Sequence, residues 1–316
     1  MKKVMITGSL GQIGSELVER LRKDLGTDNV IATDIRELGD NPVVKDGIFE
    51  ILDVMDKDRM LDLAKKYQVD TLIHLASLLS AVAETKPQVA WNLNMGGLMN
   101  ALETARELKL KMFMPSSIAA FGPSTPMDGT PQVTIQRPNT MYGVTKVAGE
   151  LLCDYYHTKY GVDTRGVRFP GLISYKTLPG GGTTDYAVDI YYEAIKTGHY
   201  DSFIAAGTKM DMMYMPDAID AIVNLMNADG EKLINRNAYN ITAMSFEPNE
   251  LAAAIQKVMP DFTLGFKVDP ARQKIADSWP NWIDASAAKA EWNFNPKYDI
   301  DAMTVDMLDH LKEKLG

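Results

Sequence analysis

Cysteine and histidine are scarce in this sequence. Cys153 is the single cysteine among 316 residues, so the chain cannot form an internal disulfide, and we expect Cys153 to be a small core residue within a helix. The four histidines, His74, His157, His199 and His310, do not have the spacing of metal ligands. The sequence therefore excludes a disulfide-stapled scaffold, and we expect no metal site.

Basic residues and long apolar runs are also lacking. Lysine and arginine number 33 against 42 acidic residues, which gives a net charge of −9. This balance argues against nucleic acid or an anionic membrane surface as a partner. No apolar run approaches the ~20 residues that a membrane-spanning helix needs, and the first expected strand begins at Lys3, which leaves no room for a leader segment. We therefore expect a cytoplasmic protein with a small soluble substrate.

A strand, a glycine turn and a helix stand at the start of the chain. Gly8, Gly11 and Gly14 follow a short apolar run and precede an amphipathic segment. Glycines let the backbone approach a pyrophosphate, and a helix N-terminus presents unpaired N–H groups to it. A second apolar run, residues 30–33, ends in Asp34, where a carboxylate can bind the adenosine ribose. The pattern predicts a dinucleotide site; the alternative is a plain strand–helix turn with a solvated aspartate.

Strand-like and helix-like segments alternate as far as Phe169, which predicts a Rossmann-type, doubly wound parallel α/β sheet. Beyond Phe169 the elements become shorter. We expect residues 1–175, with 201–235 returning to them, to form the dinucleotide-binding domain, and 176–200 and 236–316 to form a smaller C-terminal α/β substrate-binding cap. The expected strands include 48–51, 71–75, 112–114 and 164–169, and the expected helices include 56–66, 87–109, 145–160, 186–196, 216–227 and 248–258.

Small and polar residues follow several expected strands, at the edge where a parallel sheet binds ligands. Asp53 and Val54 follow one strand and could flank an adenine ring, although Asp53 fits a helix cap about as well. The next strand is followed by Ala76 and Ser77, with Ser80 just beyond as a candidate for the substrate pocket. Ser116 and Ser117 come directly after the strand 112–114.

Tyr142 and Lys146 are four residues apart at the start of an expected helix, so they share one face. A tyrosine with its ordinary pKa of ~10 is no base near neutral pH. An adjacent ammonium group and a positively charged nicotinamide would both lower that pKa. Ser117 can donate or relay a hydrogen bond to the same substrate oxygen. An exposed helix pair without chemistry is the alternative for this spacing.

Taken together, these motifs resemble the extended branch of the short-chain dehydrogenase/reductases, which includes nucleotide-sugar epimerases and dehydratases. The resemblance covers nearly the whole chain and implies NAD as cofactor and Ser117, Tyr142 and Lys146 as the catalytic group, with Asn94 as a structural asparagine. The implied cofactor contacts are Gly8, Gly11, Gln12, Ile13, Gly14, Asp34, Ile35, Asp53, Val54, Leu75, Ala76, Ser77, Asn94, Ser116, Tyr142, Lys146 and Phe169.

Three further segments, 167–174, 180–187 and 213–218, resemble the L-threonine 3-dehydrogenases of this branch. Met210 stands where sugar-nucleotide relatives usually carry an arginine for the substrate diphosphate. The resemblance implies NAD-dependent oxidation of the β-hydroxyl of L-threonine to 2-amino-3-oxobutanoate, a step of threonine catabolism, with Tyr142 as base. The implied substrate contacts are Ser80, Ser117, Tyr142, Gly182, Thr184, Asp185 and Trp279.

Two other functions and two further properties follow from the same residues. The alternatives are a nucleotide-sugar 4-epimerase or dehydratase and a non-catalytic NAD(P)-sensing regulator; the intact Ser117, Tyr142 and Lys146 disfavour the regulator. Helices 87–109 and 145–160 carry more apolar surface than one sheet face covers, which predicts a homodimer. Asp34 predicts a preference for NAD over NADP, although Arg36 lies two residues on.

Overall fold

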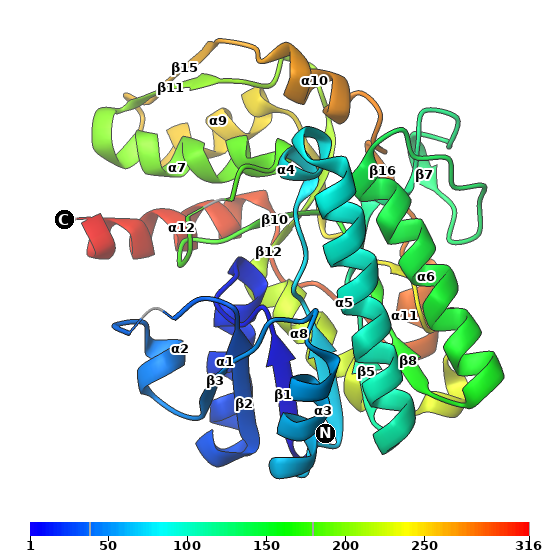
Figure 1. The fold of residues 1–316 in the computed structure, drawn as a ribbon. Helices are drawn as coiled ribbons and strands as arrows, with labels where there is room; N and C mark the ends of the chain where they lie inside the picture. Colours follow the sequence, from blue (N-terminus) through cyan, green and yellow to red (C-terminus); the bar gives the residue numbers. More distant parts are fainter. Residues whose placement is uncertain (38, 179, 316) are drawn as a thin grey trace.

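The structure, a computed structural model, describes residues 1–37, 39–178 and 180–315, and a parallel sheet lies at its centre (Figure 1). The strand order reverses between β1 and β4, and ligands bind at such a reversal, beyond the carboxyl ends of the strands. This sheet confirms the predicted doubly wound α/β fold. Its order is β3 (Phe49–Ile51), β2 (Val30–Asp34), β1 (Val4–Thr7), β4 (Thr71–His74), β5 (Lys111–Phe113) and β8 (Asp163–Arg165).

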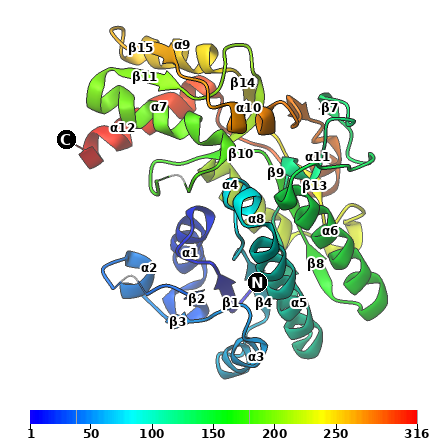
Figure 2. The same cartoon turned by 45° about the horizontal axis from the view of Figure 1, so that its top comes forward.

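Helices cover both faces of the sheet, because successive side chains of a strand point to opposite faces. Val4 and Ile6 of β1 belong to one core and Met5 to the other. The first core contains side chains of α1 (Gln12–Leu25) and α8 (Met215–Asn227); the second contains those of α3 (Lys57–Lys66), α5 (Pro87–Leu108) and α6 (Met141–Tyr160). Figures 1 and 2 show α5 and α6 side by side. Within the described ranges, no helix is long and apolar enough to cross a membrane.

Local signals explain where these helices begin and end. Thr140 accepts the N–H of Gly143 at 3.1 Å and starts α6, and Gly161, with a φ of 70°, ends it. Asp56 starts α3 by accepting the N–H of Arg59 at 2.9 Å. The helix cap that was the alternative role for Asp53 therefore belongs to Asp56.

A second layer of structure, the cap, lies above the carboxyl ends of the main sheet (Figure 1). Its core is rich in tyrosine and methionine, and the C-terminal helix closes it. The cap consists of a sheet of β10 (Gly171–Ile173), β12 (Met210–Tyr214) and β14 (Met244–Phe246), the pair β11 (His199–Ser202) and β15 (Thr263–Phe266), and the helices α7 (Tyr186–Thr197), α9 (Pro248–Val258), α10 (Pro270–Ala276) and α12 (Ile300–Leu315).

The remaining elements of the described chain are short. Their strands are β6 (Ser116–Ser117), β9 (Val167–Phe169) and β13 (Tyr239–Asn240), which pair with one another, and β7 (Asp128–Thr130) with β16 (Trp282–Ile283). Their helices are α2 (Pro42–Lys45), α4 (Ser80–Thr85), α11 (Ser286–Trp292) and the 3-10 turns η1 (Thr27–Asn29), η2 (Ile118–Ala120), η3 (Thr183–Asp185) and η4 (Gly230–Lys232).

The strand expected over residues 164–169 is divided, which corrects that prediction. Its first part, β8, completes the main sheet, whereas β9 pairs with β6 and β13. The break falls at Gly166, whose N–H bonds to the carbonyl of Arg236 at 2.8 Å. A Cβ atom at Gly166 would lie 2.5 Å from the carbonyl oxygen of Met114, so only glycine fits where the chain changes sheets.

Some segments pack with a different layer from the one that the expected domain boundaries assign to them. Residues 199–202 pair within the cap, although residues 201 and 202 belong to the segment 201–235 that was expected to return to the first domain. Tyr239 and Trp292, from the expected cap, pack in the core of the main sheet. The division into two domains at the expected residues stays a prediction.

Cys153 and the methionines of β12 are core residues, as expected. Cys153 lies inside α6 with 1% of its surface exposed, and burial raises the pKa of its thiol. Met210, Met212 and Met213 are fully buried in β12 and fill the cores on both sides of it.

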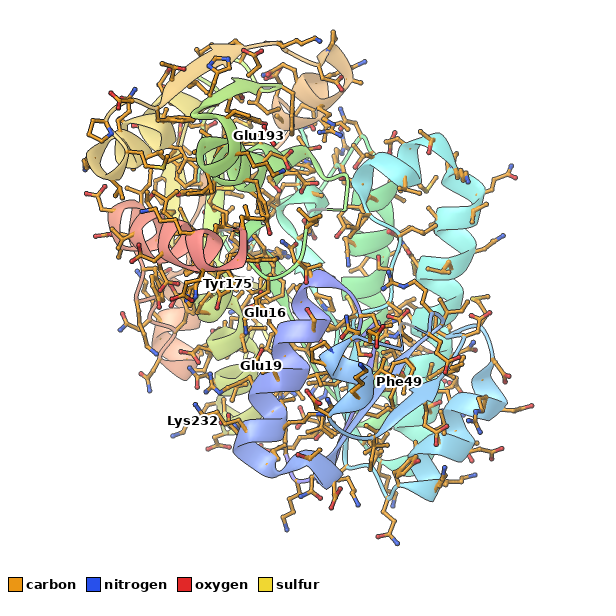
Figure 3. All side chains as sticks on the ribbon, turned by 90° about the vertical axis from the view of Figure 1, so that its left-hand side faces the viewer. Glu16, Glu19, Phe49, Tyr175, Glu193 and Lys232 are labelled. Atoms are coloured by element: carbon orange, nitrogen blue, oxygen red, sulfur yellow. The ribbon has the colours of Figure 1, made fainter. Side chains whose placement is uncertain are left out.

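The segment that follows β10 is tied to α1. Figure 3 shows Glu16 and Glu19 of α1 beside Tyr175. Ser174 donates to the Glu16 carboxylate, and Lys176 pairs with Glu19 at 2.5 Å. This chain segment leads into the loop that ends in η3, so one helix supports both the glycine turn and the path to the cap.

Candidate active site

The glycine turn forms one wall of a cavity of about 250 Å³ beyond the carboxyl ends of β1 and β4. Gly8 has a φ of 69°, and a Cβ atom there would lie 2.8 Å from the backbone nitrogen of Ala76. A Cβ atom at Gly14 would lie 2.4 Å from the carbonyl oxygen of Gly8. Both positions therefore require glycine, as predicted from the fingerprint.

The start of α1 fits the pyrophosphate of a dinucleotide. Among the residues that the structure describes, no side chain caps this helix at Gly11, which leaves its first N–H groups for an anion. The side-chain nitrogen of Gln12 is buried and has no hydrogen-bond partner in the described part of the chain. Gly11, Gln12, Ile13 and Gly14 all line the cavity. Unpaired donors around a space without side chains are what a bound phosphate group needs.

Asp34 lies at the end of β2 beside the glycine turn. Its Oδ2 accepts the N–H of Leu10 at 3.1 Å, and its Oδ1 accepts the Arg36 N–H and Nε at 3.1 and 3.0 Å. The Asp34 side chain is buried, whereas 54% of the Arg36 side chain is exposed. Ile35 between them is exposed. The ion pair that forms between Asp34 and Arg36 was not expected from the sequence.

Asp53, Val54 and Asn94, which were expected to contact the cofactor, are not among the residues that line the cavity. Val54 is buried against Gly97, and the exposed Asp53 accepts the N–H of Met55 at 2.9 Å. Asn94 of α5 accepts the Leu78 N–H at 2.8 Å and so fixes the loop after β4.

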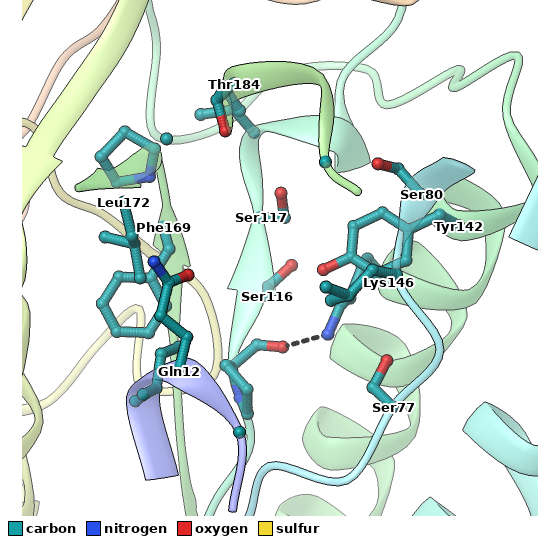
Figure 4. A pocket seen from close by; sticks show the side chains of 18 of the residues that line it. Gln12, Ser77, Ser80, Ser116, Ser117, Tyr142, Lys146, Phe169, Leu172 and Thr184 are labelled. Carbon is teal, nitrogen blue, oxygen red and sulfur yellow. Dashed lines mark hydrogen bonds between the residues drawn. The ribbon is translucent and has the colours of Figure 1, made fainter. Parts of the chain in front are cut away.

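The three expected catalytic side chains converge on the cavity (Figure 4). Ser117 comes from β6, and Tyr142 and Lys146 from the first two turns of α6. Nζ of Lys146 donates to the carbonyl oxygen of Pro115 at 2.7 Å and lies 5.1 Å from the centre of the Tyr142 ring. The helical spacing and the strand end thus bring a hydroxyl, a phenol and an ammonium group together.

Burial is the largest influence on the pKa values of both Tyr142 and Lys146. It raises the pKa of Tyr142 to about 12, while a hydrogen bond with Ser117 lowers that pKa by a smaller amount. It lowers the pKa of Lys146 to about 8. The sequence predicted that Lys146 would lower the pKa of Tyr142. In the chain by itself the pKa of Tyr142 is raised instead, because burial removes water from the phenol and from the ammonium group alike.

The cap and the loop after β4 supply the opposite wall. Ser80, Gly182, Thr184, Asp185 and Trp279 line the same cavity, as expected for the substrate contacts. The carboxylate of Asp185 accepts the N–H groups of Gly181, at 2.8 Å, and of Gly182, so it shapes its own loop. Trp279 is buried, and its indole N–H has no partner among the described residues.

The structure therefore brings most of the expected site residues into one cavity. Leu75, Ser77, Ser116 and Phe169 line it as well, whereas Ala76 and Asn94 lie at a smaller cavity behind Lys146. The sequence analysis did not predict some of the residues that line the cavity. Pro170 and Gly171 directly follow the strand β9, and a Pro-Gly pair at a strand end could have indicated these two. The missed residues are Leu79, Pro115, Ile118, Pro170, Gly171, Leu172 and Thr183.

Within the described ranges, no group of three or more histidine, cysteine, aspartate or glutamate side chains could hold a metal ion.

Known proteins resemble the chain over almost its whole length. The profile of the NAD dependent epimerase/dehydratase family matches residues 4–242. An uncharacterized epimerase/dehydratase of Staphylococcus saprophyticus is 65% identical and covers 99% of this chain and 98% of its own. The X-ray structure of an L-threonine dehydrogenase from Clostridium difficile is 68% identical, with a TM-score of 0.98 over 99% of this chain and 98% of that one.

Two other solved structures bear on the alternatives. A monomeric L-threonine 3-dehydrogenase from a metagenome is 42% identical, with a TM-score of 0.95 over 99% of this chain and all of that chain. A UDP-glucose 4-epimerase of Thermotoga maritima shares the fold, with a TM-score of 0.85, but is only 19% identical over 99% of this chain and all of its own.

Proposed function

The chain belongs to the NAD-dependent epimerase/dehydratase family, and on that premise we propose that it is an NAD-dependent L-threonine 3-dehydrogenase. One observation carries the proposal. The glycine turn, the group of Ser117, Tyr142 and Lys146, and the cap residue Thr184 all face a single cavity. The 68% identity to the Clostridium difficile L-threonine dehydrogenase, which extends through the cap, supports threonine as the substrate.

The protein contributes proton transfer, position and charge to this oxidation. NAD, when bound, accepts the β-hydrogen of threonine as hydride and carries positive charge on its oxidised ring. Tyr142 takes the proton of the β-hydroxyl, and Ser117 holds the same oxygen by a hydrogen bond. Because burial raises the pKa of Tyr142 to about 12, this phenol depends on nearby positive charge to release its proton, and Lys146 supplies it. The products are 2-amino-3-oxobutanoate, NADH and a proton.

The cap orients the substrate. Thr184 and the backbone of η3 bind the threonine carboxylate, and Ser80 and Trp279, which line the same cavity, are further substrate contacts. Trp279 offers an indole N–H that is buried and unpartnered in the described part of the chain. The glycine turn from Gly8 to Gly14 would hold the pyrophosphate of NAD, Asp34 would bind the ribose, and Asp53 and Val54 would contact the adenine, with Ile35 as a further cofactor contact.

Met210 separates this function from the nucleotide-sugar alternative. It is fully buried in β12 and has no charge to offer a diphosphate. A sugar-nucleotide enzyme needs a cation for that group, because a buried diphosphate without one is strongly unfavourable. A regulator that only senses NAD(P) has no need of the converging Ser117, Tyr142 and Lys146.

Formation of NADH across a panel of substrates tests the proposal. L-Threonine, its three stereoisomers, L-serine and UDP-sugars are supplied separately with NAD. We expect NADH only with the 3-hydroxy amino acids and fastest with L-threonine. The UDP-sugar samples are also analysed by chromatography, because an epimerase or dehydratase returns the hydride to its product and leaves no net NADH. Conversion of a UDP-sugar without a response to L-threonine would instead identify an epimerase or dehydratase.

A cytoplasmic homodimer completes the proposal. The outer faces of α5 and α6 expose Trp91, Leu151 and Tyr155 by 43%, 62% and 51%. Pairing of these helices with those of a second copy would bury this apolar surface. Light scattering at micromolar concentration tests it, with Leu151→Glu as the interface variant. A monomer mass for the unchanged protein, as in the monomeric metagenome enzyme, contradicts the dimer but not the activity.

A further inference from the structure

A buried ion pair lies directly behind the catalytic residues. Glu150 of α6 and Arg168 of β9 are 3% and 7% exposed. Nε and Nη2 of Arg168 donate to the two carboxylate oxygens of Glu150 at 3.0 and 2.8 Å. Ser116 donates to Oε1, and the side chain of Gln136 donates to Oε2 at 2.9 Å. Among the described residues, each hydrogen-bond partner of this carboxylate is a donor, and donors are what a charged carboxylate needs around it.

Stability alone is a poor explanation for this pair. Desolvation of two buried charges can outweigh their attraction, so such a pair is weak support for a fold. Its position is more telling. Ser116 precedes Ser117 in β6 and pairs with Arg168 across the sheet, while Glu150 follows Lys146 by one helical turn. The ion pair therefore joins the helix that holds Tyr142 and Lys146 to the strand that presents Ser117.

The charge on Lys146 depends on few neighbours. Burial is the largest influence on its pKa and lowers it, whereas Glu150 is the main group that raises it, followed by Cys153. From β4, His74 faces Lys146, but burial lowers the pKa of His74 to about 3, so it carries no charge near neutral pH. On α6 itself, Tyr142 is held as a phenol by burial.

The two charges of the ion pair come from different elements. Glu150 lies one helical turn after Lys146 on α6, so both side chains share one helix face. The guanidinium group of Arg168 extends from β9, where Nη1 donates to Asn240 at 3.0 Å and the group lies 5.0 Å from the centre of the Phe121 ring. Arg168 is not among the charges that shift the pKa of Lys146.

We propose that Glu150, held by Arg168, is a positioning residue of this active site: its carboxylate ties α6 to β6 and keeps the Lys146 ammonium group charged. The role of Lys146 in turnover is the only part that rests on the proposed function. The charge of Lys146 itself belongs to the free protein and is measured there.

Two substitutions at one position separate charge from shape. Glu150→Gln keeps the size and an acceptor oxygen but removes the negative charge; Glu150→Asp keeps the charge and shortens the side chain. Protein labelled with ¹³C at Cε of lysine is titrated by NMR without NAD, and Lys146→Arg identifies the Lys146 signal. We expect the midpoint of Lys146 to fall by about one pH unit or more in Glu150→Gln, because a nearby opposite charge changes a pKa by ~1–3. In Glu150→Asp it moves much less.

Turnover gives an independent measurement. If Lys146 must be charged, the alkaline limb of the kcat profile moves to lower pH by the same amount in Glu150→Gln. Above the limb, kcat then falls by up to ~10-fold for each pH unit that the limb moves. Threonine titrates alike with every variant, so differences between variants belong to the enzyme. Loss of kcat in both Glu150 variants with the limb at its original pH would show a purely structural role and overturn the proposal.

A matched control comes from another buried arginine. Arg165 is 1% exposed and pairs with Asp163 at 2.8 Å in β8. Asp163→Asn breaks that pair, and we expect lower stability with an unchanged Lys146 midpoint. If Glu150→Gln does not fold, Glu150→Gln with Arg168→Met leaves no unpaired buried charge and still removes the carboxylate. The proposal is refuted if the Lys146 midpoint does not move in Glu150→Gln or, where that variant does not fold, in the double variant. This outcome holds even if threonine is not the substrate.

Discussion

Replacement of Asp34 by asparagine should change which cofactor the enzyme uses. Asparagine keeps the shape and can still accept the Leu10 N–H that Asp34 accepts at 3.1 Å. It removes the negative charge that a 2′-phosphate of NADP would meet, and it releases the Arg36 guanidinium group, whose Nε now donates to Asp34 at 3.0 Å. One substitution therefore removes a repulsion and frees a cation at the same place.

The size of the effect follows from the burial of the two side chains. Two like unit charges ~4 Å apart repel by about 4 kcal/mol at an effective dielectric constant of ~20. Arg36 is more than half exposed, so solvent screens it and it offsets only part of this repulsion. We expect a net preference of about 1–2 kcal/mol, or roughly 5–30-fold in kcat/KM for NAD over NADP. Asp34→Asn should lower that ratio at least ~10-fold, because lost ribose hydrogen bonds weaken NAD at the same time.

Initial rates with each cofactor at saturating L-threonine measure the ratio, and fluorescence titration with NADH and NADPH measures binding alone. Asp34→Asn combined with Arg36→Ala should lose the gain with NADP. Asp53→Asn is the matched control, because this exposed carboxylate is expected near the adenine, which both cofactors share. Equal efficiency with both cofactors in the unchanged protein, or an unaltered ratio in Asp34→Asn, would refute the reasoning.

Three further outcomes are expected. Tyr142→Phe should lower kcat with L-threonine by ~100-fold or more while NAD binding survives, and near-normal oxidation would disprove the assigned base. Thr184→Ala should raise the KM for L-threonine by about 5–30-fold, equivalent to ~1–2 kcal/mol, without changing NAD affinity; unchanged kinetics would remove Thr184 from the substrate site. Burial raises the pKa of Asp211 to about 8, and the carboxylate accepts the N–H of Ile283 at 3.0 Å. The folded chain thus holds a proton that the unfolded chain releases near pH ~4, so this contribution to stability is complete below ~pH 4 and is lost as the pH rises to about 8, by up to about 1.4 kcal/mol per pH unit. Asp211→Asn should flatten the pH dependence of urea unfolding over that range; the same slope in both proteins would contradict the assignment.

Local sequence was sufficient for the parts of the site that depend on neighbouring residues. Gly8 has a positive φ and Gly14 approaches the carbonyl oxygen of Gly8 too closely for a Cβ atom, and the structure places both as the spacing predicts. Tyr142 and Lys146 share a face because they are one helical turn apart. The doubly wound sheet followed from the alternation of strands and helices.

Contacts between distant segments were beyond that reasoning. The expected strand 164–169 gave no sign that the chain changes sheets at Gly166, because the carbonyl of Met114 that requires the glycine lies far away in sequence. The direction of the Tyr142 pKa depended on how completely other segments bury it. The ion pair of Glu150 with Arg168 joins residues from a helix and a strand, and nothing in the local pattern of either indicates it.

The buried thiol of Cys153 makes this protein convenient for spectroscopy. Thiolates, not thiols, react with maleimides and alkylating agents. Burial raises the pKa of Cys153 and covers all but 1% of its surface, so it stays inert near neutral pH. A cysteine introduced on the surface would therefore be the one that a probe labels. Pairs of such probes, one on the cap and one on the main sheet, could follow the distance between them during turnover without any prior removal of native cysteine.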